Sequence, residues 1–186
     1  MKAMGGEDLH LSDAELKQIV IDWRNASPHI VQLWWAVDDA VKKAIRTKGT
    51  AETHGLQFSY QGKMLFITLP SGRKLCYAQP KIEENRFGGE SVTYMGASKK
   101  WERIESYGSK FVENIVQGIA RDLLLNAMKT LSDCRIVAHV HDEIIIEADK
   151  HMTVEDVCEQ MSRTPPWAKG LILKADGYEC EFYRKE

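Results

Sequence analysis

Hydrophobic and polar positions follow a helical spacing over the first quarter of the chain. Ser12-Asp13-Ala14-Glu15 has the form of a capping box, and the apolar residues after it recur every three or four positions. This pattern predicts a helix over about residues 12–25. A second helix is predicted to open at Ser27-Pro28, because proline suits the first helical position, and to end at Gly49.

The spacing then changes to an extended pattern. Residues 55–77 are rich in β-forming residues and are interrupted by Gln61-Gly62 and by Pro70-Ser71-Gly72. Strands are therefore predicted near 56–60, 63–69 and 73–79, with the last two as a hairpin. Residues 80–100 show little periodicity and are predicted to be a loop.

The second half mixes helical and extended patterns. A long helix is predicted over about 105–131, then a strand near 134–140, a tight turn at His141-Asp142 and a strand near 143–148. Thr153 is expected to cap a helix over about 154–162, residues 164–167 to form a rigid link, and residues 171–183 to form closing strands. This order favours an α+β fold, in which a helical segment (1–54) precedes an antiparallel sheet packed with the long helix (55–186).

Composition narrows the class of protein. The 186 residues are 44% hydrophobic and 28% charged, which is typical of a soluble globular chain. The formal net charge of −2 argues against binding nucleic acid through bulk charge, although a local basic face remains possible. Four separated cysteines without a C-x-x-C pair indicate reduced thiols in a cytoplasmic protein, and no apolar stretch is long enough to span a membrane.

The segment VAHVHDEIII (137–146) places polar residues inside an apolar run. Alternation predicts that Val137, His139 and His141 share one face of the strand, opposite Ile136. Asp142 falls at the turn and Glu143 follows it, so this tip could bind a hard cation such as Mg²⁺. Two alternatives stay open at this point: a hairpin with polar tip residues and a core His139, or an H-x-H zinc pair.

The zinc alternative needs further ligands. The remaining histidines, His10, His29, His54 and His151, form no recognisable set.

The long helix carries a narrow polar stripe. At about 100° per residue, Lys110, Asn114, Gln117 and Arg121 fall on one side, and Val112, Ile115, Val116, Ile119 and Leu123 fall opposite. Amide and guanidinium groups donate hydrogen bonds, and the minor-groove edges of all base pairs offer acceptors. The stripe could therefore sense duplex geometry without reading sequence, although every surface helix has a polar face. The basic residues Lys42, Lys43, Arg46 and Lys48 end the second helix, where they suit its dipole.

These two motifs together resemble a known family. The helix YGSKFVENIVQGIARDLLLNAM, followed at short distance by VAHVHDEIIIEAD, is similar to the C-terminal part of family A DNA polymerases, the bacterial DNA polymerase I type. WRNASPHIVQLWW, LPSGRKLCY and RTPPWAKGLILKADGYECEFY resemble counterparts in the phage and prophage branch, so the resemblance extends over nearly the whole chain. It implies that residues 1–54 derive from the fingers and residues 55–186 from the palm.

The resemblance also implies roles for individual residues. Asp142 is similar to the carboxylate that binds the catalytic Mg²⁺ pair, and Glu143 to the neighbouring acid that supports this metal site. His141 resembles the histidine near the primer terminus, and Gln117 the helix glutamine that contacts the minor groove at the primer–template end.

The other stripe residues, Asn114, Arg121 and Lys110, are expected to assist DNA binding. In the bacterial enzymes the helix asparagine lies four residues before the glutamine, whereas here Glu113 holds that position.

Part of the family's catalytic site has no match in these 186 residues. The motif D-x-S-x-I-E-x-R, which carries the other catalytic aspartate, and the fingers helix with R-x-x-x-K and Y-G are both missing, and KAMGG (residues 2–6) resembles residues just after that helix. We therefore expect the C-terminal part of a DNA-directed DNA polymerase that is inactive alone: a split half with a separate N-terminal chain, a prophage remnant or an excised piece.

Its expected partners are primer–template DNA and deoxynucleoside triphosphates. The alternative function is a non-catalytic module that binds duplex DNA or another protein. Trp34-Trp35 and the first strands are expected to be partly uncovered, which would promote self-association.

Overall fold

A computed structural model describes residues 11–149 and 151–183. The predicted helix and its capping box are confirmed in α1 (Asp13–Ala26), where the Ser12 hydroxyl accepts from the Glu15 N–H and the Glu15 carboxylate accepts from the Ser12 N–H at 2.8 Å. The pKa of Glu15 is lowered because its carboxylate accepts from the Ser12 N–H and also from the Ser12 hydroxyl, at 2.7 Å. The segment KAMGG (residues 2–6) and His10 lie outside the described residues.

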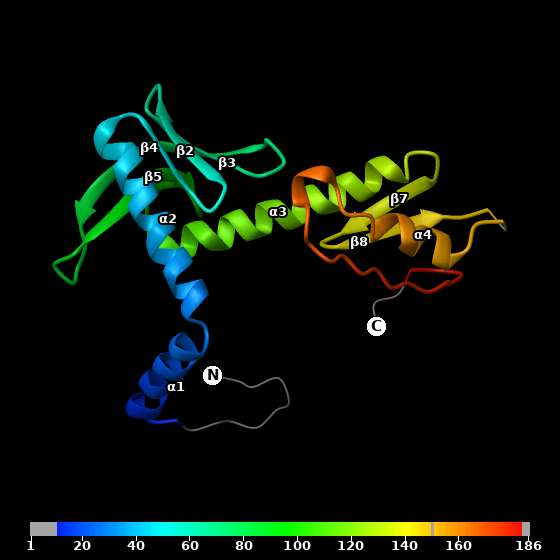
Figure 1. Cartoon of the computed structure of the whole chain (residues 1–186), viewed down its shortest axis with the longest axis horizontal. Helices are drawn as coiled ribbons and strands as arrows, with labels where there is room; N and C mark the ends of the chain where they lie inside the picture. The colour runs from blue at the N-terminus through cyan, green and yellow to red at the C-terminus, as the bar shows by residue number, and fades with distance from the viewer. Residues whose placement is uncertain (1–10, 150, 184–186) are drawn as a thin grey trace.

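Helix α1 joins α2 (Pro28–Thr47) through Ser27, whose backbone leaves the helical region. The indole rings of Trp23 and Trp34 stack across this joint, with ring centroids 5.5 Å apart and planes 15° from parallel. No residue of α1 is buried, and the helix projects from the body of the molecule (Figure 1). The second helix ends on Lys48, which takes the left-handed conformation one residue before the predicted Gly49.

A six-stranded antiparallel sheet follows, with its strands in chain order. Its members are β1 (Thr50–Thr53), β2 (Leu56–Gln61), β3 (Met64–Thr68), β4 (Lys74–Glu84), β5 (Glu90–Ala97) and β6 (Trp101–Ser106). The predicted hairpin is confirmed as β3 and β4. Strand β1 pairs with β2, so the expected boundary at residue 54 falls inside one sheet.

The predicted loop over residues 80–100 is wrong, because strands occupy most of it. A register shift between Ala78 and Lys81, with Gln79 at φ 47°, disrupts the alternation that sequence reasoning looks for. The turn into β5 is held by Asn85, whose side-chain oxygen accepts from the N–H groups of Phe87 and Gly89 at 2.9 and 3.1 Å.

Helices α2 and α3 (Gly108–Thr130) pack with the sheet around one core. Its members include Val37, Val41, Phe58, Leu65, Ile67, Phe111 and Ile115. A Cβ on Gly108 would lie 2.2 Å from the backbone oxygen of Trp34, so glycine permits the close approach of the two helices. Helix α3 begins three residues later than predicted because residues 101–106 belong to β6.

The far end of α3 leads into a second, smaller unit of structure (Figure 1). It contains the two-stranded sheet of β7 (Arg135–Val140) and β8 (Glu143–Glu147), and α4 (Val154–Met161) capped by Thr153, all of which were predicted. The 3₁₀ turn Pro166–Ala168 overlaps the predicted link over residues 164–167.

The predicted closing strands are wrong, since residues 171–183 form no strand. Alternation alone does not make a strand without a partner backbone, and Ile172 and Phe182 remain 93% and 71% exposed.

Within the described residues, no helix is long and apolar enough to cross a lipid bilayer. All four cysteines are free thiols. The observed fold is therefore α+β with an antiparallel sheet, as the sequence predicted.

A hairpin tip and a helix face as the candidate functional site

The tip of the β7–β8 hairpin presents its polar residues to solvent. Val140 pairs with Glu143, so His141 and Asp142 form a two-residue turn, and His141 takes the left-handed conformation (φ 52°) typical of such turns. His141, Asp142 and Glu143 are all exposed. The turn thus holds the Asp142 carboxylate at the end of two paired strands, as predicted.

The C-terminal segment returns to this tip, which sequence reasoning missed. The Tyr183 hydroxyl donates to Oε2 of Glu143 at 3.1 Å. This hydrogen bond raises the pKa of Tyr183, since ionising the phenol would break the bond and bring two negative charges together.

The faces of β7 differ from the prediction because the strand contains a bulge. The register shifts between Ile136 and Ala138, so Val137 is an extra residue. His139 now pairs with Ile144 and Ile136 with Ile146, and these four residues share one face. The prediction that Ile136 and His139 lie on opposite faces is therefore wrong. His139 is also exposed, so it is not a core histidine.

On α3, three of the four predicted stripe residues already have partners within the protein. Lys110 pairs with Glu113 at 2.8 Å, and Asn114 donates to the hydroxyl of Tyr77 at 3.0 Å. The pKa of Lys110 is raised by its carboxylate partner, and burial raises the pKa of Tyr77 to about 12. Gln117 is exposed and has no hydrogen-bond partner among the described residues, which leaves its amide available to a ligand.

The fourth stripe residue, Arg121, meets His139 of the hairpin. Its two terminal nitrogens lie 3.3 Å and 3.4 Å from the two ring nitrogens of His139. The structure therefore joins the two motifs that the sequence presented separately. The apolar side of α3 is as predicted except at Val116, which is 55% exposed.

Behind the stripe, an ion pair ties α3 to the β3–β4 turn. The carboxylate of Asp122, on a side chain only 5% exposed, accepts from Arg73 Nε and from Ser71 Oγ, each at 2.5 Å. Arg73 also donates to the backbone oxygen of Gly118 at 2.8 Å. Sequence reasoning missed this cluster because its members lie 45 to 51 residues apart.

Several of the other basic groups also have protein partners. Lys42 pairs with Asp38 at 2.5 Å, Arg46 contacts Glu90, and Arg103 donates to Gln79 and Thr93. Two of the four basic residues that end α2, Lys42 and Arg46, are thus paired with carboxylates of the same protein. The candidate DNA surface is therefore the stripe on α3 rather than a broad basic patch.

Among residues 11–149 and 151–183, no three histidine, cysteine, aspartate or glutamate residues gather as a metal-binding group. Asp142 and Glu143 provide two hard oxygen donors, which suit Mg²⁺ but would need ligands from DNA, nucleotide or another polypeptide to complete its shell. The zinc alternative gains no support, because His139 contacts Arg121.

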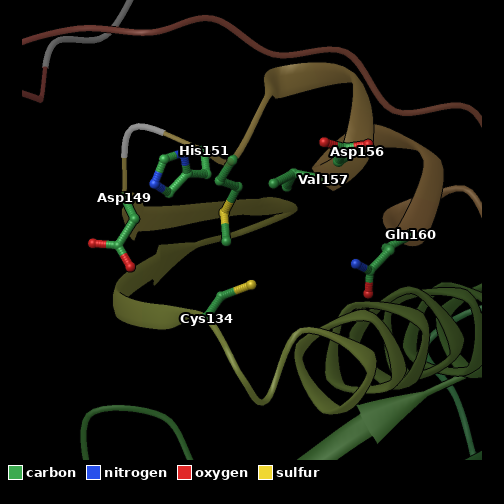
Figure 2. Close-up of a pocket in the computed structure, with 7 residues that line it drawn as sticks. Cys134, Asp149, His151, Asp156, Val157 and Gln160 are labelled. Carbon is green, nitrogen blue, oxygen red and sulfur yellow. The ribbon is translucent and has the colours of Figure 1, made fainter.

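A shallow hollow of about 310 Å³ lies beside the hairpin, against α4. Figure 2 shows Asp156 and Gln160 reaching it from α4, with Asp149, His151 and Cys134 on its other side. The hollow takes in none of the residues at the hairpin tip or on the α3 stripe.

The chain is 42% identical to the DNA polymerase of Bacillus phage SP02 over 98% of its own length. The chain is similar to one part of a DNA polymerase. It spans 29% of that phage enzyme. No family model matches the chain, and no solved structure matches it.

Proposed function

We propose that this chain supplies part of the active site and of the primer–template surface of a family A DNA-directed DNA polymerase. Three observations support the proposal: the similarity to the phage DNA polymerase, the carboxylate turn at Asp142, and the stripe on α3. A fourth observation carries most weight, because the contact of Arg121 with His139 connects the stripe to the strand that leads into the turn.

In this proposal each part of the surface has its own task. Asp142 and Glu143 would hold Mg²⁺ at the tip, and the ion would supply stabilisation of the negative charge that develops on the phosphate oxygens. His141 lies beside the primer terminus, whose 3′-hydroxyl attacks the α-phosphate of a deoxynucleoside triphosphate and releases pyrophosphate. Gln117 donates to minor-groove acceptors that all base pairs share, so it senses base-pair shape and not sequence.

We further propose that the chain is inactive without a second polypeptide segment. Two-metal phosphoryl transfer uses a pair of cations about 3.5–4 Å apart, usually held by several carboxylates. The described residues offer two carboxylates at the tip, and the 186 residues contain no D-x-S-x-I-E-x-R motif. A further polymerase segment, on this or on another polypeptide, would provide the missing carboxylate and the groups that bind the nucleotide.

The test is Mg²⁺ binding followed by primer extension. Titration of the chain with Mg²⁺ should give weak binding at one site that Asp142→Ala removes. Glu147→Ala is the matched control, since this exposed carboxylate lies on the same hairpin. Adding the N-terminal part of the phage polymerase should permit extension by the wild type and by Glu147→Ala, but not by Asp142→Ala. Robust extension by the chain alone would contradict the requirement for a second segment.

A second candidate is a non-catalytic module that binds duplex DNA. The exposed amide of Gln117, which has no hydrogen-bond partner among the described residues, supports it without any metal. In that case neither Mg²⁺ nor the substitution Asp142→Ala would change the affinity of the protein for duplex DNA. A metal-dependent affinity that Asp142→Ala removes would decide for the polymerase.

A further inference from the structure

We infer that His139 is a positioning residue: through Arg121 it fixes the stripe of α3 relative to the turn that carries Asp142. The inference deepens the proposed function and rests on it, because the stripe and the turn must meet the same primer–template end. It concerns a residue that sequence reasoning left between a core role and a zinc role.

The contact brings together two planar groups, the guanidinium of Arg121 and the imidazole of His139. Both terminal nitrogens of Arg121 approach both ring nitrogens of His139, at 3.3 and 3.4 Å. A neutral imidazole has only one acceptor nitrogen, so the two contacts cannot both be full hydrogen bonds. Guanidinium groups also stack on aromatic rings, and that geometry suits this double approach.

Few other side-chain contacts among the described residues join α3 to the β7–β8 hairpin. Within residues 11–149 and 151–183, the contact between Arg121 and His139 is the only side-chain hydrogen-bond contact that joins α3 to β7 or β8. Gln117 lies one helical turn before Arg121 on the same side of α3, and Asp142 lies three residues after His139. A shift at this contact would therefore change the spacing between the amide of Gln117 and the carboxylate of Asp142.

The bulge at Val137 sets the side of β7 on which His139 lies. It places His139 on the face of Ile144 and Ile136, where the ring meets α3. An exposed arginine without such a partner samples many rotamers, and holding it in one removes part of the entropy that ordering it on DNA would cost. His139 thus pre-arranges Arg121 without itself needing to touch DNA.

The first arm of the test uses the protein without DNA. Arg121→Ala and His139→Ala should each move the backbone amide NMR resonances of Asp142 and Glu143. Lys129→Ala, an exposed cation on the same helix, should leave them in place. Unmoved resonances in both variants would overturn the positioning role, whatever the protein does with DNA.

The second arm measures affinity for a primer–template duplex by fluorescence anisotropy in a double-mutant cycle. We expect His139→Ala to weaken binding about tenfold, which corresponds to roughly 1.4 kcal/mol. Combined with Arg121→Ala it should add less than about twofold, because both changes break one interaction. His139→Gln, which keeps a planar polar group, should recover most of the affinity. His29→Ala, an exposed histidine on α2, is the control.

The two arms separate the possible failures. Wild-type protein that does not bind the duplex would overturn the proposed function, and the NMR arm would then decide the coupling alone. Additive losses in the cycle, together with normal wild-type binding, would overturn the role of His139 while leaving the proposed function standing.

Discussion

Replacing Asp122 with alanine should destabilise the protein by about 2–3 kcal/mol, although the residue lies on a helix with a long polar face. Its side chain is 5% exposed and accepts from Arg73 and Ser71. Removing one partner of a buried ion pair typically costs about 3–5 kcal/mol, because the other charge is left unpaired.

The expected loss is smaller than that range because Arg73 is not fully buried. Its side chain is 41% exposed and keeps the bond to the backbone oxygen of Gly118, so water can partly replace the lost carboxylate. Asp122→Asn should cost less than Asp122→Ala, because the amide oxygen can still accept from one of the two donors.

The assay is urea unfolding followed by far-UV circular dichroism, with the midpoint converted into a free energy of unfolding. Glu147→Ala is the control, since this residue pairs with Arg135 at 3.3 Å on the surface, and it should cost less than about 1 kcal/mol. If Asp122→Ala costs no more than this control, the ion pair does not hold α3 against the β3–β4 turn.

Three further outcomes follow from packing and exposure. Gly108→Ala should destabilise the protein more than Gly118→Ala does. A Cβ at position 108 would lie 2.2 Å from a backbone oxygen, whereas a Cβ at position 118 would lie 2.8 Å from a leucine methyl group, which can move more easily. Equal unfolding midpoints for the two variants would contradict this prediction. The pKa of Tyr77 is about 12 in the folded protein and about 10 in the unfolded chain. Between pH 10 and 12 the unfolded chain loses this proton while the folded protein keeps it, so the free energy of unfolding should fall by about 2–3 kcal/mol. Tyr77→Phe should remove that decline in urea unfolding. Trp35 is 67% exposed near the uncovered α1, so sedimentation should show self-association that Trp35→Glu reduces, and a strictly monomeric wild type at high concentration would refute this.

Sequence motifs that span only a few neighbouring residues predicted the helix start and the turn correctly. The capping box of Ser12 and Glu15 fixed the start of α1, and the short polar interruption at His141-Asp142 identified the turn. In each case the side chains that decide the conformation lie within one turn of the backbone they stabilise, so the local sequence contains the necessary information.

Features that depend on distant residues were not predicted. Asp122 finds Arg73 across 49 positions, and nothing in the sequence near either residue specifies the pairing. The bulges in β4 and β7 each add a residue that has no cross-strand partner, which shifts the alternation on which a face assignment depends. The candidate site was therefore predicted residue by residue, while the contact that unites it was not.

The stacked indoles of Trp23 and Trp34 give this molecule an optical reporter of its own. They belong to α1 and α2 and meet across the break at Ser27, so any change in the angle between the two helices must alter their overlap. Coupled indole chromophores at such separation contribute a paired signal to far-ultraviolet circular dichroism, and that signal depends on the angle between the rings. The angle between α1 and α2 can therefore be followed in solution without an attached dye.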